Sequence, residues 1–346
     1  MIKRVSNPPN PFTGQSVEWF DVPAPPPAEV YEEHAKSIVS KNESPDVGFS
    51  YSVNPYRGCF HGCSYCYARP THHYIDFGAG IDFERKIVAK VNAPELLEAA
   101  FMKPSWTGER IVFSGVTDCY QPLEHSLELT RRCLEVCLRF QNPVSVITKG
   151  ALVARDAALL GELARRADAE VFISLAFSDD SAARAVEPHT PSPRARLRAM
   201  KTLHDAGVRV GIALAPLIPG LNDTQIPELL ARAKESGASR AFMTLLRLPA
   251  EVEEIFFAQL DEAVPSRSAK VRHAIREMKD GALNRSSFGE RMVGSGARWE
   301  AVEWLFQTCC KKHGITTGER RMEDRTDTIG KRQSTFRRPT AQLDLF

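Results

Sequence analysis

The sequence predicts an α/β fold: a partial barrel of six β/α units with an extended N-terminal arm and a C-terminal helical extension. Short apolar runs rich in β-branched residues alternate with longer segments whose apolar residues recur every three to four positions. Repeated β/α units of this kind indicate parallel strands joined by right-handed crossovers. The 346 residues are enough for one large α/β domain with appendages, or for two domains.

Six strands and five covering helices are expected. The strands lie at 50–54, 111–115, 144–150, 170–177, 208–216 and 241–248. The first helix begins near Pro94, and the other four lie at 124–140, 155–167, 193–206 and 225–236. In TIM-like barrels, the loops that follow the strands build the site. One rim should therefore carry the cysteine-rich loop after the first strand together with the segments SGVTDCYQP, TKG, LAFSDD and APLIPGLND.

The flanking regions differ in composition from the predicted barrel at 48–250. Residues 1–47 are polar and rich in proline, and we expect an extended arm with little regular structure. Residues 68–86 are expected to form an aromatic and glycine-rich loop. Residues 251–313 are expected to be helical, with a buried face that carries Trp299, Trp304 and Phe306. Residues 314–346 turn polar and basic, and a flexible tail is expected.

Charge is distributed unevenly. The net charge is +2, yet residues 311–346 hold nine Lys/Arg and five Asp/Glu, which gives +4 and leaves −2 on the rest. A basic tail favours a polyanionic partner, although a solvated tail has the same composition. No apolar run has the length of a membrane span, and no secretory signal is visible. The eight cysteines are therefore expected to be free thiols, metal ligands or catalytic groups in a reducing cytoplasm rather than disulfides, and a monomer is expected.

The most informative stretch is RGCFHGCSYCY, residues 57–67. It places Cys59, Cys63 and Cys66 at a CxxxCxxC spacing. Three thiolates can hold three corners of a cubic iron–sulfur cluster and leave the fourth iron open for chemistry. The alternative is a zinc site, whose fourth ligand would be one of three nearby histidines, namely His61, His72 or His73.

This spacing after a first strand, followed by repeated β/α units, resembles the radical S-adenosylmethionine (SAM) superfamily. The runs NPYRGCFHGCSYCYARP, SGVTDCYQPLE and TKG together resemble its spore photoproduct lyase-like branch, also called DNA repair photolyase-like. The resemblance covers roughly residues 48–250. It implies that the three cysteines ligate a [4Fe–4S] cluster and that SAM chelates the open iron. A reducing donor such as flavodoxin or ferredoxin would supply the electron that splits SAM into methionine and a 5′-deoxyadenosyl radical.

The resemblance also assigns cofactor-binding residues. Tyr65 stands where the superfamily has an aromatic residue against adenine, with loop packing as the alternative. The segment of Ser114, Gly115, Thr117 and Asp118 occupies the place of a Gly-Gly-Glu-like element that accepts a hydrogen bond from the SAM ammonium group. Asp118 would alternatively cap the following turn. Lys149 and Ser174 would hold the SAM carboxylate and ribose. Three helical arginines are further candidates for the carboxylate: Arg194, Arg196 and Arg198.

Two residues are candidate catalytic groups, Tyr67 directly after the last cysteine and Cys119 after the Thr117–Asp118 pair. Spore photoproduct lyases place a hydrogen-donating cysteine just before that pair, where this chain has Gly115 or Val116. Cys119 is either a relocated hydrogen donor or a small buried residue. This departure puts thymine-dimer reversal itself in doubt. The other four cysteines are expected to be structural: Cys133, Cys137, Cys309 and Cys310.

The chain ends in QLDLF, with Gln342, Leu343, Asp344, Leu345 and Phe346. This peptide resembles the motif by which bacterial polymerases and repair factors bind the replicative sliding clamp. A tether that presents a terminal Leu-Phe pair suits an apolar pocket, whereas the alternative is a terminal segment folded onto the body. The motif supports DNA as the substrate independently of the barrel.

Three hypotheses follow. The first is a radical SAM enzyme that acts on damaged DNA and is recruited through the sliding clamp. The second keeps the enzyme class and exchanges DNA for RNA or a peptide. The third is a zinc-binding clamp adaptor without catalysis.

Overall fold

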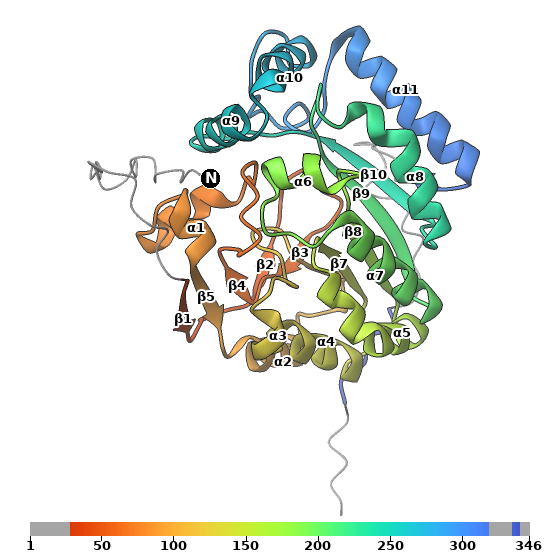
Figure 1. Cartoon of the computed structure of the whole chain (residues 1–346). Coiled ribbons are helices and arrows are strands. Elements are labelled where there is room, and N and C mark those ends of the chain that lie inside the picture. The colour runs from red at the N-terminus through yellow and green to blue at the C-terminus, as the bar shows by residue number, and fades with distance from the viewer. Residues whose placement is uncertain (1–27, 318–333, 340–346) are drawn as a thin grey trace, which may run out of the picture.

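The computed structural model describes residues 28–317 and 334–339, and an open, curved sheet of eight strands forms its centre (Figure 1). The strand order is β11-β10-β9-β8-β7-β6-β3-β2. Seven of the eight strands are parallel, and six of these correspond to the six predicted from the sequence: β3 (Tyr51–Val53), β6 (Ile111–Phe113), β7 (Val144–Thr148), β8 (Ala169–Ser174), β9 (Arg209–Leu217) and β10 (Arg240–Leu245). β2 (Val39–Lys41) pairs antiparallel with β3 at one edge, and β11 (Thr316–Thr317) pairs parallel with β10 at the other.

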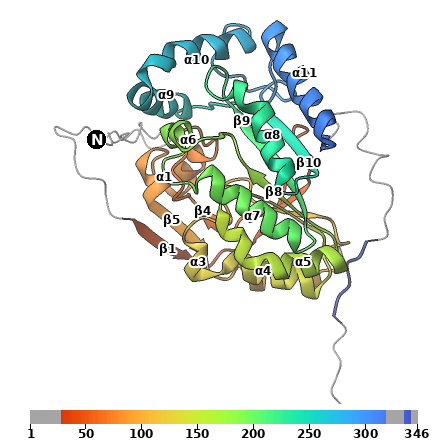
Figure 2. The ribbon, with the colours of Figure 1, turned by 45° about the vertical axis from the view of Figure 1, so that its right-hand side comes forward.

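The helices cover the outer face of the sheet, and the main core lies between the two (Figures 1 and 2). Val144 and Val146 of β7 and Val171 and Ile173 of β8 are buried in this core, at every second position of each strand. The covering helices are α2 (Ala93–Met102), α4 (Leu129–Arg139), α5 (Ala157–Arg166), α7 (Pro193–Asp205) and α8 (Ile226–Glu235). The prediction of one helix over 124–140 is wrong, because Glu128 adopts φ = 50° and separates α3 (Glu124–Leu127) from α4. A 3₁₀ turn, η2 (Ala151–Asp156), precedes α5.

A second, three-stranded sheet lies beside the barrel and was not predicted. Its order is β1 (Glu29–Glu33), β5 (Lys86–Lys90) and β4 (Tyr56–Arg57). The expectation of an extended arm with little regular structure is therefore wrong at β1 and β2, and that of a loop over 68–86 is wrong for most of its length. That second segment also contains η1 (Arg69–Ile75) and α1 (Ile81–Arg85). Glu29 pairs with Lys86, so the pairing joins segments far apart in the chain, and no local pattern signals it.

The C-terminal region is helical, as predicted, with α9 (Val252–Ala263), α10 (Pro265–Met278) and α11 (Gly296–His313). A short helix that was not predicted, α6 (Asp180–Val186), contacts α9. Trp299 and Phe306 are buried, but the prediction that Trp304 is buried is wrong, since it is 69% exposed. Five residues of an α-helix turn the side chain by about 140° relative to Trp299, which puts Trp304 on the outer face.

Residues 334–339 dock on the floor of the barrel, at the loops that precede the strands. The Phe336 ring centroid lies 5.8 Å from that of Phe101 and 6.1 Å from that of Phe140. The Thr335 hydroxyl donates to the carbonyls of Gln141 and Ala167, at 2.9 Å and 3.0 Å. The Arg338 guanidinium donates to three carbonyls at the end of α2 and in the loop after it. The expectation of a flexible tail is therefore wrong for this segment.

The QLDLF motif, residues 342–346, lies outside the described residues, as do residues 1–27 and 318–333. Within the described ranges, no helix is long and apolar enough to cross a membrane.

Replacing Phe336 with Ala should lower the free energy of unfolding by about 1–2 kcal/mol, because a partly buried aromatic ring is lost from the floor. Thermal and denaturant unfolding measure the effect. Arg337→Ala is the matched control, since this neighbouring side chain is exposed and only its backbone N–H bonds to Phe140. Unfolding of Phe336→Ala at the wild-type midpoint would show that the docked segment contributes no stability.

Candidate cluster and cofactor site

The cysteine loop lies at the rim formed by the carboxyl ends of the strands, between β4 and η1. Cys59 and Cys63 are buried and Cys66 is half-buried, and none of the three forms a disulfide. The loop turns at Gly58 and Gly62, whose φ angles are 74° and 65°. A Cβ atom on Gly58 would lie within 2.9 Å of three neighbouring atoms, so both the turn and the packing require glycine there.

A fully buried arginine holds the backbone of this loop. Arg69 Nε donates to the Cys63 carbonyl at 3.0 Å, and Nη2 donates to the Gly62 carbonyl at 3.1 Å and to Glu84. Its Nη1 donates to two further carbonyls of the chain after η1. Because carbonyls turned away from water need donors, Arg69 fixes the shape of the loop.

The chain after β6 supports the loop from the other side. Gln121 accepts from the Phe60 N–H at 3.0 Å and donates to the Gly58 carbonyl at 3.2 Å. The Thr117 hydroxyl donates to the same carbonyl at 2.6 Å. The SGVTDCYQPLE run therefore acts as a scaffold for the cysteine loop. The Thr117 hydroxyl donates its hydrogen to the loop itself, at the Gly58 carbonyl.

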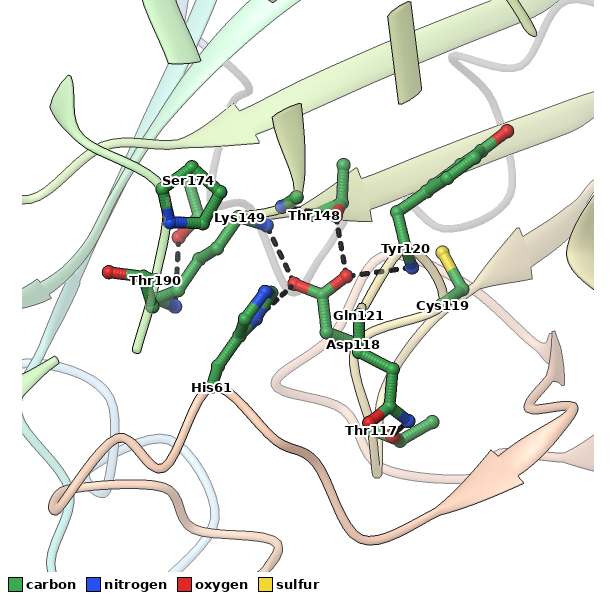
Figure 3. Close-up of polar contacts among 12 residues, drawn as sticks. His61, Thr117, Asp118, Cys119, Tyr120, Gln121, Thr148, Lys149, Ser174 and Thr190 are labelled. Carbon is green, nitrogen blue, oxygen red and sulfur yellow. Dashed lines mark hydrogen bonds and ion pairs between the residues drawn. The ribbon is translucent and has the colours of Figure 1, made fainter. Parts of the chain in front are cut away.

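Asp118 is the centre of this scaffold (Figure 3). Its carboxylate accepts hydrogen bonds from the Thr148 hydroxyl at 2.5 Å and the Lys149 N–H at 2.7 Å, and His61 Nδ1 lies 3.5 Å away. Burial alone would raise the pKa of Asp118, but the hydrogen bonds from His61, Thr148 and Lys149 hold it well below its usual range.

The ionised Asp118 carboxylate thus connects His61 of the cysteine loop to Thr148 and Lys149 at the end of β7. It also accepts from the Tyr120 N–H at 2.9 Å, which is the turn-capping bond that the sequence left open. Both of its oxygens are already engaged within the protein.

Lys149, Ser174 and Tyr65 come together beside the loop, at the ends of neighbouring strands. Lys149 Nζ donates to the Ser174 hydroxyl at 3.2 Å and lies 5.5 Å from the Tyr65 ring centroid. Burial alone would lower the pKa of Lys149, but the nearby Cys63 and Glu187 raise it above its usual value. The half-buried ammonium therefore places a positive charge at the rim.

A buried network that the sequence analysis missed holds this group from behind. The Tyr65 hydroxyl donates to Glu187, which also pairs with Arg196. Arg196 donates to the Ser174 carbonyl at 2.9 Å as well, so it is occupied within the protein. Arg194 and Arg198, the other two candidates for the SAM carboxylate, are exposed. No sequence signal identifies Glu187, because its partner Tyr65 lies 122 residues away.

The turn after β6 faces the open side of the rim. Ser114 and Gly115 both have positive φ angles, 126° and 125°. The Ser114 hydroxyl donates to the Thr117 carbonyl at 2.9 Å, and the Gly115 carbonyl accepts from the Tyr67 hydroxyl. Tyr67 is 48% exposed, so this candidate catalytic residue lies where a substrate has access.

Cys119 lies in the main core, away from this rim. It is fully buried, and its thiol is 3.8 Å from the Phe113 carbonyl. This placement favours the structural role that the sequence analysis left open. The other four cysteines outside the loop are also buried.

The residues present fit a cubic iron–sulfur cluster better than a zinc ion. Each histidine of the zinc alternative lies near another partner: His61 faces Asp118, His72 Nε2 is 3.0 Å from the Lys86 carbonyl, and His73 Nε2 is 3.4 Å from Glu251. Among residues 28–317 and 334–339, no three His, Cys, Asp or Glu side chains are arranged to hold one metal ion. Thiolates of a cubic cluster bind separate irons and need not converge in this way.

Replacing Asp118 with Asn should release His61 and lower the free energy of unfolding by about 1–3 kcal/mol, because the Thr148 hydroxyl and the N–H groups of Lys149 and Tyr120 lose a charged acceptor. The iron content after anaerobic reconstitution should fall with it. Thermal unfolding and iron analysis measure both effects. Asp180→Asn, an exposed carboxylate on α6, is the control. Wild-type stability and iron content in Asp118→Asn would contradict the scaffold role.

Comparison with known proteins agrees with this geometry. The Radical SAM superfamily profile matches residues 53–233. The uncharacterized protein Rv2578c of Mycobacterium tuberculosis is 35% identical over 230 residues, which cover 66% of this chain and 68% of that protein. The uncharacterized protein MJ0683 of Methanocaldococcus jannaschii is 30% identical over 197 residues, covering 57% of this chain and 71% of that protein.

Among solved structures, spore photoproduct lyase complexed with dinucleoside spore photoproduct is similar with a TM-score of 0.61 at 14% identity. The similarity covers 83% of this chain and 81% of that chain. A mutant of that lyase with bound SAM and the same dinucleoside has a TM-score of 0.61 at 15% identity, over 83% of this chain and 80% of that one. At this identity the likeness shows the fold. The chain belongs to the radical SAM superfamily, whose members use a [4Fe–4S] cluster and SAM.

Proposed function

We propose that this protein is a radical SAM enzyme that acts on damaged DNA. The observation that carries the enzymatic part is the buried cysteine loop, held by Arg69 and Asp118 at a rim where Lys149 and Ser174 also lie. A loop held by side chains on several elements keeps its three thiols in one arrangement, as a cluster site requires.

The chemistry follows from the cofactors of the superfamily. Cys59, Cys63 and Cys66 would hold the [4Fe–4S] cluster, which would supply the electron for reductive cleavage of SAM. Lys149 binds the SAM carboxylate from the rim, with Ser174 as its hydrogen-bond partner. The Tyr65 ring provides an apolar face beside Lys149, and the positive φ angles at Ser114 and Gly115 turn backbone groups toward the open side.

The proposal that the substrate is DNA rests on fewer observations than the proposal of radical SAM chemistry. Spore photoproduct lyase, which shares the fold, has been solved with a dinucleoside lesion. Tyr67, exposed at the rim and bonded to Gly115, is the proposed protein group that exchanges hydrogen with the substrate. Cys119 is buried in the core and is not assigned this role.

Recruitment by a bacterial sliding clamp is the second part of the proposal. The motif of residues 342–346 combines a glutamine with a terminal Leu-Phe pair. Support comes from the docking of residues 334–339 on the barrel floor, opposite the cysteine loop. A partner bound just after Pro339 would meet the floor and leave the rim open to DNA.

Anaerobic reconstitution should give a brown protein with broad absorption near ~400 nm, and reduction in the presence of SAM should release 5′-deoxyadenosine. Cys63→Ala should abolish both, whereas Cys309→Ala, a buried cysteine on α11, should retain both. Absorption spectroscopy and chromatography of the nucleoside measure the result. A colourless protein that binds zinc and leaves SAM intact would support the adaptor hypothesis instead.

Deletion of residues 342–346 should abolish co-elution with the sliding clamp, because the apolar pair that fills the pocket is lost. The control carries the same five residues in scrambled order, which keeps length and composition and should also fail to bind. Size-exclusion chromatography with purified clamp measures the effect. Co-elution of either variant at the wild-type level would contradict recruitment through this motif.

A further inference from the structure

Two cations near the end of β10 have no salt-bridge or hydrogen-bond partner in the described part of the chain. Lys279, at the C-terminal end of α10, is 0% exposed, and its Nζ has no hydrogen-bond partner. Arg247, two residues after β10, is half-buried, and its Nε is buried without a hydrogen-bond partner. Their charges are close enough to interact, and burial together with Arg285 and Arg247 lowers the pKa of Lys279 to about 8.

Two neighbouring arginines, unlike Lys279 and Arg247, form salt bridges with carboxylates. Arg285 pairs with Asp280 and lies 3.6 Å from Glu290. Arg291 pairs with Asp46, and it also donates to Ser44. Acidic groups are therefore available in this region, yet no described carboxylate forms a salt bridge with Lys279 or Arg247. Asp46, whose charge acts on Arg247, is already paired with Arg291.

An unpaired buried cation costs free energy of folding, because water no longer solvates it. Proteins retain such groups where an anion binds, since the ligand then supplies the missing charge. The pair therefore points to an anionic ligand that meets Arg247, with Lys279 adding positive potential from behind.

The location indicates what the anion belongs to. The Arg247 guanidinium lies 5.9 Å from the ring centroid of Tyr67, which directly follows the last cysteine of the loop. The Arg291 guanidinium lies 4.6 Å from the ring centroid of Phe288, which is 60% exposed. Exposed aromatic rings beside cations are suited to stacked bases and phosphates of a single nucleic-acid strand.

We propose that Arg247, with the buried Lys279 adding positive potential behind it, is a phosphodiester-binding site at the rim that holds the backbone of a nucleic-acid substrate beside Tyr67. This inference rests on the proposed function, because it specifies how that substrate is held. An acidic peptide would also satisfy the two charges, but it would leave the exposed rings of Tyr67 and Phe288 without bases to stack on.

The test uses the cluster-reconstituted protein with SAM and a fluorescent single-stranded oligonucleotide of ten thymidines, with binding followed by anisotropy over a range of salt concentrations. Arg247→Met and Lys279→Met should each weaken binding about tenfold and lower the slope of log K against log salt by about one. Arg272→Met is the matched control, because Arg272 lies on the same helix as Lys279 but pairs with Asp261. It should change the affinity less than twofold.

Two further arms identify the ligand. An oligonucleotide with neutral methylphosphonate linkages should bind the wild type weakly and lose little affinity in either variant. A polyglutamate peptide should compete poorly. Competition by polyglutamate at the affinity of the oligonucleotide, or unchanged affinity in both variants, would overturn the proposal.

A stability measurement separates ligand binding from a structural role. Without nucleic acid, Lys279→Met should unfold at a higher temperature than the wild type, because a buried unpaired charge is removed. A lower unfolding temperature together with wild-type affinity would assign Lys279 to the fold and overturn the proposal. SAM cleavage is scored separately: protein that binds the oligonucleotide through Arg247 but releases no 5′-deoxyadenosine would contradict only the proposed chemistry.

Discussion

The cysteine loop turns twice in a buried environment, so its carbonyl groups need donors that water does not supply. Arg69 meets most of this need from the chain that follows the loop, and Gln121 with Thr117 meets the rest from the end of β6. The loop therefore keeps its shape only when it is held against the sheet. Three thiols close together in the chain become a site because distant elements hold their backbone.

The same constraint explains why the rim residues divide into two groups. Asp118 and Thr117 use their polar atoms to hold the loop, whereas the Lys149 ammonium donates to the Ser174 hydroxyl, which in turn donates to the Ala215 carbonyl. Glu187 and Arg196 stabilise the Tyr65 and Ser174 side from within the core. Residues close in sequence thus have different contacts: the turn after β6 holds the loop, and the turn after β7 places the Lys149 ammonium beside Ser174 and Tyr65.

Local pattern was enough to predict the six parallel strands, because each is a short apolar run with a helix after it. The spacing of Cys59, Cys63 and Cys66 was likewise a local signal. Arg69 and Glu187 were not predictable, because a charged residue in a loop is normally solvated and its burial depends on partners set by the fold. The β1–β5 pairing was not predictable for the same reason, because it depends on partners far apart in the chain. Trp304 was predicted wrongly because it lies five residues after Trp299, which in an α-helix places the two side chains on different faces.

Three thiolates would leave one iron of the cluster open, and we propose that SAM binds there. Electron–nuclear double resonance on the reduced, reconstituted protein with SAM carrying ¹⁵N in its amino group or ¹⁷O in its carboxylate tests it directly. The account predicts a hyperfine coupling from both labels to the cluster spin. A fully reconstituted [4Fe–4S] protein that shows coupling from neither label would contradict it.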